Sequence, residues 1–211
     1  MPVDPGYHRY PPLIQREQYA KGGMGRWYWD FRDRSIFNFI QPDDQDILDL
    51  GCGEGITLER LIKNFPGRNI QGIDVMPENV AICESLHLPA RLGNVYHLDC
   101  RDSSQDVVLF LEVLEHLSEP ETALREIKRI LRPGGRALIL FPNDRTFLVS
   151  RLLTLRFREA FYDPGHVRQW TIADMAHLLP SLGFRILASK MIPFYFWAIS
   201  LHGLVVAVKQ N

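Results

Sequence analysis

The first group of residues with chemical potential is a glycine-rich turn. Asp49-Leu50-Gly51-Cys52-Gly53-Glu54-Gly55 follows a short apolar run and precedes a helical pattern that begins near Ile56. Such a turn exposes backbone N–H groups and the amino end of a helix to a ligand. Dinucleotide sites favour glycine where this chain has Ile56, and the acids Asp49 and Glu54 would repel a pyrophosphate. The turn therefore suits a ligand with an ammonium group and argues against NAD.

The second group is Gly72-Ile73-Asp74, at the end of the next apolar run. Asp74 follows Gly51 by roughly 20 residues, the offset at which an acid reaches ribose hydroxyl groups in nucleotide-binding folds. An aspartate before Pro77 could instead close a turn or cap a helix. The glycine turn upstream favours the ribose contact.

The third group is Glu112-Val113-Leu114-Glu115-His116. Two carboxylates and an imidazole on one turn after a strand are chemically reasonable ligands for a hard metal ion. The same side chains can instead pack against and cap the following helix. We adopt this second interpretation and predict no metal site.

These groups require a scaffold, which the apolar pattern predicts. Strand-length apolar runs alternate with helical patterns, as in a parallel sheet with crossover helices. Strands are expected at 47–50, 70–75, 106–111 and 137–141, and two final runs, 184–190 and 204–208, could pair antiparallel. Helices are expected at 27–40, 58–65, 77–86, 119–131 and 171–182, the last capped by Thr171 and Asp174, and Pro133-Gly134-Gly135 is expected to form a turn.

The composition limits the possible classes of protein. A chain of 211 residues with 46% hydrophobic content favours one domain, and a net charge of -1 creates no general attraction for nucleic acid or an anionic membrane. The three cysteines, Cys52, Cys83 and Cys100, match neither a disulfide framework nor a zinc site. The first residues do not resemble a secretory signal, and the apolar stretch 191–208 is interrupted and short for a bilayer span. We expect a cytoplasmic protein without a transmembrane segment.

Taken together, the motifs resemble those of class I S-adenosylmethionine-dependent methyltransferases, of the small-molecule type with ubiquinone-pathway-like motifs. The resemblance covers roughly residues 45 to 190, and five motifs in the right order are far more specific than any one of them. The motifs are Asp46 to Gly55, Gly72-Ile73-Asp74, Asp106-Val107-Val108-Leu109, Glu112 to Leu117 and Leu131 to Gly135.

The resemblance implies an α/β fold: a Rossmann-like sheet of about seven strands, mostly parallel with an antiparallel last strand, helices on both faces and an N-terminal helical cap. We divide the single domain, 1–211, into four parts. These are an N-terminal arm and cap helix (1–42), a cofactor-binding core (45–141), a substrate-covering insertion (143–170), and a C-terminal helix and strands (171–211).

The resemblance also implies how S-adenosylmethionine is held. Gly51 and Gly53 would approach its methionine part, Asp49 would orient the amino group, and Asp74 would bind the ribose. Asn94 stands where the family often has an acid for the adenine amino group, and an amide carbonyl can also accept that hydrogen bond. The remaining expected cofactor contacts are Cys52, Val75, Val95, Glu112 and Val113.

The acceptor of the methyl group is not specified by any motif. Our first expectation is a small or lipid-like acceptor with an oxygen nucleophile, for which His116 and His166 are the candidate general bases. The other five histidines have no such motif context. In some relatives a similar Glu-x-x-Glu-His holds a divalent ion, and His166 to Thr171 resembles a histidine motif of small-RNA 2′-O-methyltransferases. The alternatives are therefore an RNA methyltransferase and a non-catalytic cofactor-binding protein with the same fold.

The N-terminal aromatic segment, Arg26 to Arg32, has two open interpretations. It could close over the cofactor, with Arg26 or Arg32 near the methionine carboxylate. It could instead be an amphipathic helix that buries its tryptophans against the sheet. The two roles are compatible.

Overall fold

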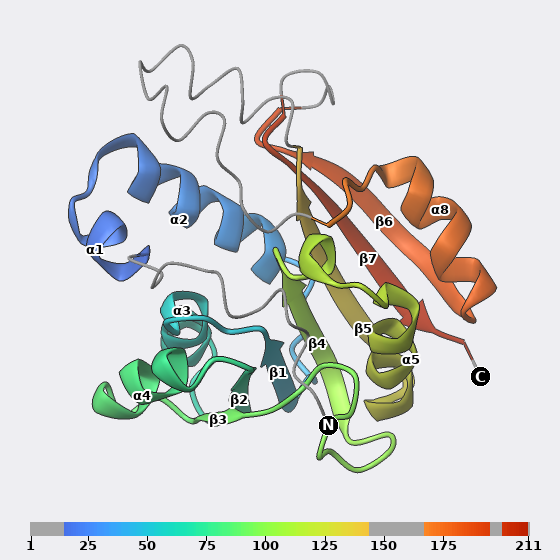
Figure 1. Cartoon of the computed structure of the whole chain (residues 1–211), viewed down its shortest axis with the longest axis horizontal. Helices are drawn as coiled ribbons and strands as arrows, with labels where there is room; N and C mark the ends of the chain where they lie inside the picture. The colour runs from blue at the N-terminus through green and yellow to red at the C-terminus, as the bar shows by residue number, and fades with distance from the viewer. Residues whose placement is uncertain (1–14, 144–166, 195–199, 211) are drawn as a thin grey trace.

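The computed structural model describes residues 15–143, 167–194 and 200–210. Its centre is a seven-stranded sheet in the order β3-β2-β1-β4-β5-β7-β6, with helices on both faces (Figure 1). β1 pairs in parallel with β2 and β4, and β7 is antiparallel to both β5 and β6, so the predicted fold class is confirmed. The strands are β1 (Asp46–Leu50), β2 (Asn69–Asp74), β3 (Ala90–Leu92), β4 (Gln105–Leu111), β5 (Leu131–Pro142), β6 (Phe184–Ile192) and β7 (His202–Lys209).

The alternation of side chains along the central strand β4 builds two cores. Val108 and Phe110 face a cluster with α5 and α8, and Val107 and Leu109 face a cluster with α2 and α3. The helices are α1 (Gln15–Ala20), α2 (Gly23–Phe37), α3 (Ile56–Asn64), α4 (Pro77–Ser85), the 3-10 turn η2 (Leu114–His116), α5 (Pro120–Ile130) and α8 (Ile172–Ser181). The predicted capping box of α8 is confirmed, because Thr171 Oγ1 accepts from Asp174 N and Asp174 Oδ2 accepts from Thr171 N.

Two details of the predicted elements are wrong. β5 begins at Leu131 and continues through Pro133-Gly134-Gly135, so this segment is an irregularity within the strand, where the pairing with β4 shifts register, and not a turn before it. The helix expected over 27–40 begins at Gly23. Trp27 is 61% exposed because it lies outside the buried face of this helix, which contains Ile36.

The described residues contain no helix long and apolar enough to cross a bilayer. The expected insertion, 143–170, lies largely outside the described residues, as does His166.

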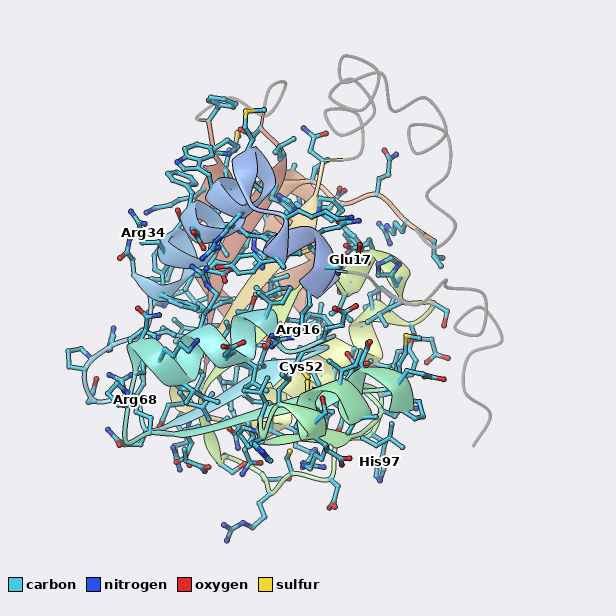
Figure 2. All side chains as sticks on the ribbon, turned by 90° about the vertical axis from the view of Figure 1, so that its left-hand side faces the viewer. Arg16, Glu17, Arg34, Cys52, Arg68 and His97 are labelled. Carbon is cyan, nitrogen blue, oxygen red and sulfur yellow. The ribbon has the colours of Figure 1, made fainter. Side chains whose placement is uncertain are left out.

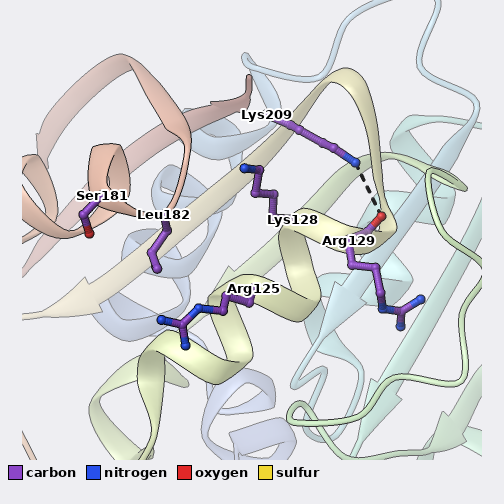
Figure 3. A pocket seen from close by; sticks show the side chains of 6 residues that line it. All are labelled: Arg125, Lys128, Arg129, Ser181, Leu182 and Lys209. Carbon is purple, nitrogen blue, oxygen red and sulfur yellow. Dashed lines mark hydrogen bonds between the residues drawn. The ribbon is translucent and has the colours of Figure 1, made fainter. Parts of the chain in front are cut away.

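Functional groups meet at one edge of the sheet. The carboxyl ends of β1, β2, β4 and β5 lie there, and so does the amino end of β7, because Pro142 pairs with His202. In open α/β sheets ligands bind at this edge where the strand order reverses, which is here between β1 and β4. A cavity of about 420 Å³ lined by Arg125, Lys128, Arg129, Ser181, Leu182 and Lys209 lies at the opposite edge (Figure 3).

Candidate active site

The glycine turn is a bare stretch of backbone at the carboxyl end of β1. Gly51 N and Cys52 N donate to Ile73 O at 2.7 and 3.1 Å, which fixes the turn against β2. Gly51 has φ +80°, and a Cβ atom there would lie 2.3 Å from Val113 Cγ2. Because no side chain fits at Gly51, Val113 of the loop after β4 packs directly against the backbone of the turn.

Asp49 lies beneath this turn and carries an unsatisfied polar atom. The residue is 2% exposed, and its Oδ2 atom has no hydrogen-bond partner among the residues that the structure describes. Burial, with a further contribution from Asp33, raises the pKa of Asp49 to about 7. A ligand ammonium group would supply both the missing hydrogen bond and the missing positive charge. The site therefore fits the amino group that the sequence led us to expect.

Asp74 lies where the sequence places it, at the end of β2 beside the turn. Its Oδ2 accepts from Gly53 N at 2.8 Å, and its Oδ1 accepts from Met76 N at 2.9 Å and from Asn79 Nδ2 at 3.1 Å. The adjoining Val75 is half-buried. Asp74 thus braces the glycine turn, and its bonds to Met76 and Asn79 are of the turn-closing kind that the sequence left open.

The expected adenine contacts follow β3. Asn94 Oδ1 accepts from Tyr96 N at 2.9 Å, so the amide carbonyl already closes a local turn. Its second lone pair is still available for a ligand. Val95 is 7% exposed and belongs to the core cluster with α5.

Glu54 has a different role from the one that its charge suggested. Its carboxylate accepts from Gln15 N at 3.2 Å and Arg16 N at 2.7 Å, while Arg16 Nε and Nη2 donate to Glu54 O and Gly55 O at 2.6 and 3.0 Å. The expectation that Glu54 faces an ammonium ligand is therefore wrong: the side chain anchors α1 to the glycine turn. Figure 2 shows Arg16 above Cys52, between the N-terminal helices and the turn.

The anchor can be tested by limited proteolysis. Glu54→Ala removes two hydrogen bonds to a carboxylate and is expected to cost about 1–3 kcal/mol of local stability. Trypsin should then cleave after Lys21 roughly tenfold faster or more, because cleavage follows the open population. Glu17→Ala is the control, since it removes only the exposed ion pair between Glu17 of α1 and Lys21, just after that helix. Equal cleavage of both variants would contradict the anchor.

Glu112, at the end of β4, connects the turn to α2. The buried Arg32 donates to Glu112 Oε1 at 2.5 Å and to Thr57 Oγ1 at 3.1 Å, and it pairs with Asp33 at 2.9 Å. Burial acts to raise the pKa of Glu112, but His202 and Arg32 outweigh it and hold that pKa well below its usual range. Of the two arginines considered for the methionine carboxylate, Arg32 lies at this edge beside Asp49, whereas Arg26 is exposed.

His202 was set aside at the sequence level, and the structure gives it a context. Its ring stacks on Tyr28 with centroids 5.6 Å apart, its Nδ1 is hydrogen-bonded to the Tyr28 hydroxyl, and its Nε2 lies 3.4 Å from Glu112 Oε1. No local motif could reveal this contact, because Tyr28 and His202 are 174 residues apart.

The Glu-x-x-Glu-His segment forms η2 and its flanks. Glu115 is 1% exposed, and His116 Nε2 lies 4.0 Å from Glu115 Oε1. Val167 N donates to Glu115 O at 2.8 Å, so Val167 lies against this turn. Within the described ranges, no group of three or more His, Cys, Asp or Glu side chains could hold a metal ion.

Comparisons with known proteins agree with this architecture. A family model described as a methyltransferase domain matches residues 48–139. A Mycolicibacterium smegmatis protein described as a probable S-adenosylmethionine-dependent methyltransferase is 32% identical over 75% of this chain and 60% of its own length. A ubiquinone biosynthesis O-methyltransferase of Aeromonas salmonicida is 34% identical over 49% of this chain and 46% of its own. The chain thus spans less than two thirds of either relative.

A solved structure shares the fold. A SAM-dependent methyltransferase from Archaeoglobus fulgidus superposes with a TM-score of 0.69 at 17% identity, over 92% of this chain and 98% of that one. From the matching family model, the relatives and the sheet order, we conclude that this chain belongs to the class I S-adenosylmethionine-dependent methyltransferases.

Proposed function

We propose that the protein transfers the methyl group of S-adenosylmethionine to a small or lipid-like acceptor through an oxygen nucleophile. The observation that carries the proposal is the buried Oδ2 of Asp49 beneath a bare glycine turn, which finds no hydrogen-bond partner within the described part of the chain. The cofactor supplies a methyl group that is already activated on a sulfonium, so the protein needs mainly to place the reactants in line and exclude water.

The proposed cofactor contacts follow the strand ends. Asp49 binds the amino group, with Gly51, Cys52 and Gly53 along the methionine part. Asp74 and Val75 contact the ribose, and Asn94 and Val95 contact the adenine. Glu112 and Val113 lie beneath the cofactor. An acceptor would then lie toward β5 and β7, where the exposed Phe194 follows β6. We also propose that the insertion, 143–170, covers the acceptor. The three free thiols accord with the cytoplasmic location that we propose.

The cofactor assignment predicts a measurable loss in an Asp74 variant. Asp74→Ala is expected to weaken binding of the product S-adenosylhomocysteine by about 1–3 kcal/mol, the range for a hydrogen bond to a charged group. Because Asp74 also braces the turn, Asn79→Ala is the control, since it removes only one of those bracing contacts. Calorimetry that finds equal affinities for wild type and Asp74→Ala would refute the ribose assignment.

The acceptor can be found with methyl-labelled S-adenosylmethionine. We expect wild-type protein added to a cell extract to label a small or lipid-like compound, with the label on oxygen, and a cofactor-binding variant such as Asp74→Ala to label far less. Label in RNA would favour the alternative that the histidine pattern raised. The absence of any labelled product would favour a cofactor-binding protein without this activity.

A further inference from the structure

A second functional cluster lies next to the cofactor side of the sheet edge and shares only Glu112 with the proposed cofactor contacts. Tyr28 of α2, His202 at the start of β7 and Glu112 after β4 form a continuous chain of polar atoms. The three residues come from three separate elements that meet only in the folded protein. Such a Glu-His-Tyr arrangement can move a proton, because each member can hold it in turn.

The polar chain formed by Tyr28, His202 and Glu112 lies on the side of the sheet edge where we expect an acceptor to bind. The cofactor contacts proposed above follow β1, β2, β3 and β4, so the acceptor side of the edge lies over β5 and β7. His202 begins β7 and pairs with Pro142 at the end of β5. It is 2% exposed, whereas Tyr28 is only half-buried. The Glu112 side chain is also partly exposed, but its Oε1 atom is paired with Arg32. Tyr28 is therefore the accessible member that offers a hydroxyl group to a bound molecule.

The charges around the chain favour one direction of proton movement. Arg32 and Asp33, on the same helix as Tyr28, neutralise one another in part, and Glu112 stays ionised beside Arg32. Burial, together with Glu112, raises the pKa of Tyr28, so the hydroxyl is protonated at rest. A carboxylate beside Nε2 favours the tautomer with its proton on Nε2, in which the Tyr28 hydroxyl donates to Nδ1. The opposite ring nitrogen then faces Glu112, which stabilises the imidazolium when a second proton arrives.

We propose that Tyr28, His202 and Glu112 accept the proton of the acceptor hydroxyl group during methyl transfer. Tyr28 is the catalytic residue, which touches the acceptor, and His202 and Glu112 are positioning residues that act through it. The inference rests on the proposed function and narrows the acceptor to an alcohol or a phenol.

The step balances as follows. An electron pair of the acceptor oxygen forms the new bond to the methyl carbon while the carbon–sulfur bond of the donor breaks and leaves its electron pair on sulfur. The acceptor proton moves to Tyr28 Oη as the proton of Tyr28 moves to His202 Nδ1. His202 becomes an imidazolium beside the Glu112 carboxylate and returns its proton to solvent after the product leaves.

The test uses Tyr28→Phe and His202→Gln, with Tyr19→Phe as the matched control. Tyr28→Phe keeps the ring that stacks on His202 and removes only the hydroxyl group. Tyr19→Phe removes a hydroxyl group from the same N-terminal cap, one that bonds to Asp30 and Arg60 instead. With the labelled acceptor from the extract, both test variants should lose roughly 10²–10⁴-fold in kcat. Their affinity for S-adenosylhomocysteine should stay within about twofold of wild type, well below the tenfold change that corresponds to about 1.4 kcal/mol.

One further readout separates proton transfer from a merely structural role. The loss in Tyr28→Phe should shrink for an acceptor analogue with a more acidic hydroxyl group. A loss that is equal for all acceptors, or wild-type kcat in Tyr28→Phe, overturns the proposal.

Failure of the proposed function gives a different result. If the extract yields no labelled product, the ¹⁵N resonances of the His202 ring still test the chain. We expect a neutral ring protonated at Nε2, whose Nδ1 resonance moves in Tyr28→Phe and not in Tyr19→Phe. A ring protonated at Nδ1, or an Nδ1 resonance that does not move in Tyr28→Phe, overturns the proposal.

Discussion

Asp49→Asn is expected to weaken S-adenosylhomocysteine binding about 10- to 100-fold at pH 8, since a hydrogen bond to a charged group contributes about 1.5–3 kcal/mol. The same change should stabilise the ligand-free protein. Burial raises the pKa of Asp49 from 3.8 to about 7, so the folded state holds that proton more tightly than the unfolded state does. Stability from this group is therefore full below about pH 4 and is lost as the pH rises through 7, by up to about 4 kcal/mol.

Urea unfolding at pH 5 and pH 8 measures this effect. The asparagine variant should gain most at pH 8, where the wild-type carboxylate is ionised and buried. Asp46→Asn is the control, because it lies at the other end of β1 and its carboxylate pairs with Arg132. An Asp49→Asn protein that is less stable than wild type at pH 8 would contradict the assignment.

The raised pKa also predicts how affinity depends on pH. Below pH 7 the wild-type carboxyl group must release its proton before it can accept the ligand ammonium group. Affinity should therefore fall about tenfold for each pH unit below 7, with close to one proton released per ligand bound. Calorimetry in buffers of different ionisation enthalpy counts these protons. Asp49→Asn should show neither effect.

Gly51→Ala is expected to destabilise the protein strongly and to abolish ligand binding. The added Cβ would lie 2.3 Å from Val113 Cγ2, and the backbone has φ +80°. Overpacking costs about 1–3 kcal/mol and a left-handed conformation about 1–2 kcal/mol, so we expect a loss of about 2–5 kcal/mol with no measurable ligand binding.

Two controls divide this cost. Gly134→Ala has a similar φ of +77° and no atom within 4 Å, so it measures the backbone contribution alone. The double variant Gly51→Ala, Val113→Ala should recover the overpacking part relative to Val113→Ala by itself. If the double variant recovers nothing, the contact between Val113 and the turn is not the cause.

The sequence predicts those features of this protein that arise from local patterns. Apolar runs gave the order of strands and helices, because residues that share a core face recur at the period of their own element. The glycine turn, Asp49 and Asp74 were found because their spacing is local to one strand-turn-helix unit. The boundary at Pro133-Gly134-Gly135 was wrong because the pairing with β4 extends the strand across residues that usually end one.

The remaining features depend on contacts that no spacing encodes. Glu54 was assigned by charge alone, and its partners Gln15 and Arg16 lie 38 to 39 residues earlier. The link from Tyr28 to His202 exists only because β7 inserts between β5 and β6, which carries its first residue to the active edge.

The attachment of α1 to the glycine turn has a thermodynamic consequence. Because Glu54 and Gly55 belong to the turn and also hold Arg16, an open and a docked α1 correspond to two states of the same loop. A ligand that binds only the docked state has its apparent affinity reduced by the docked fraction. By reciprocity, binding that favours this state must hold α1 more tightly by the same factor. Substitutions in α1 can thus change the affinity of the glycine turn for its ligand without contacting that ligand.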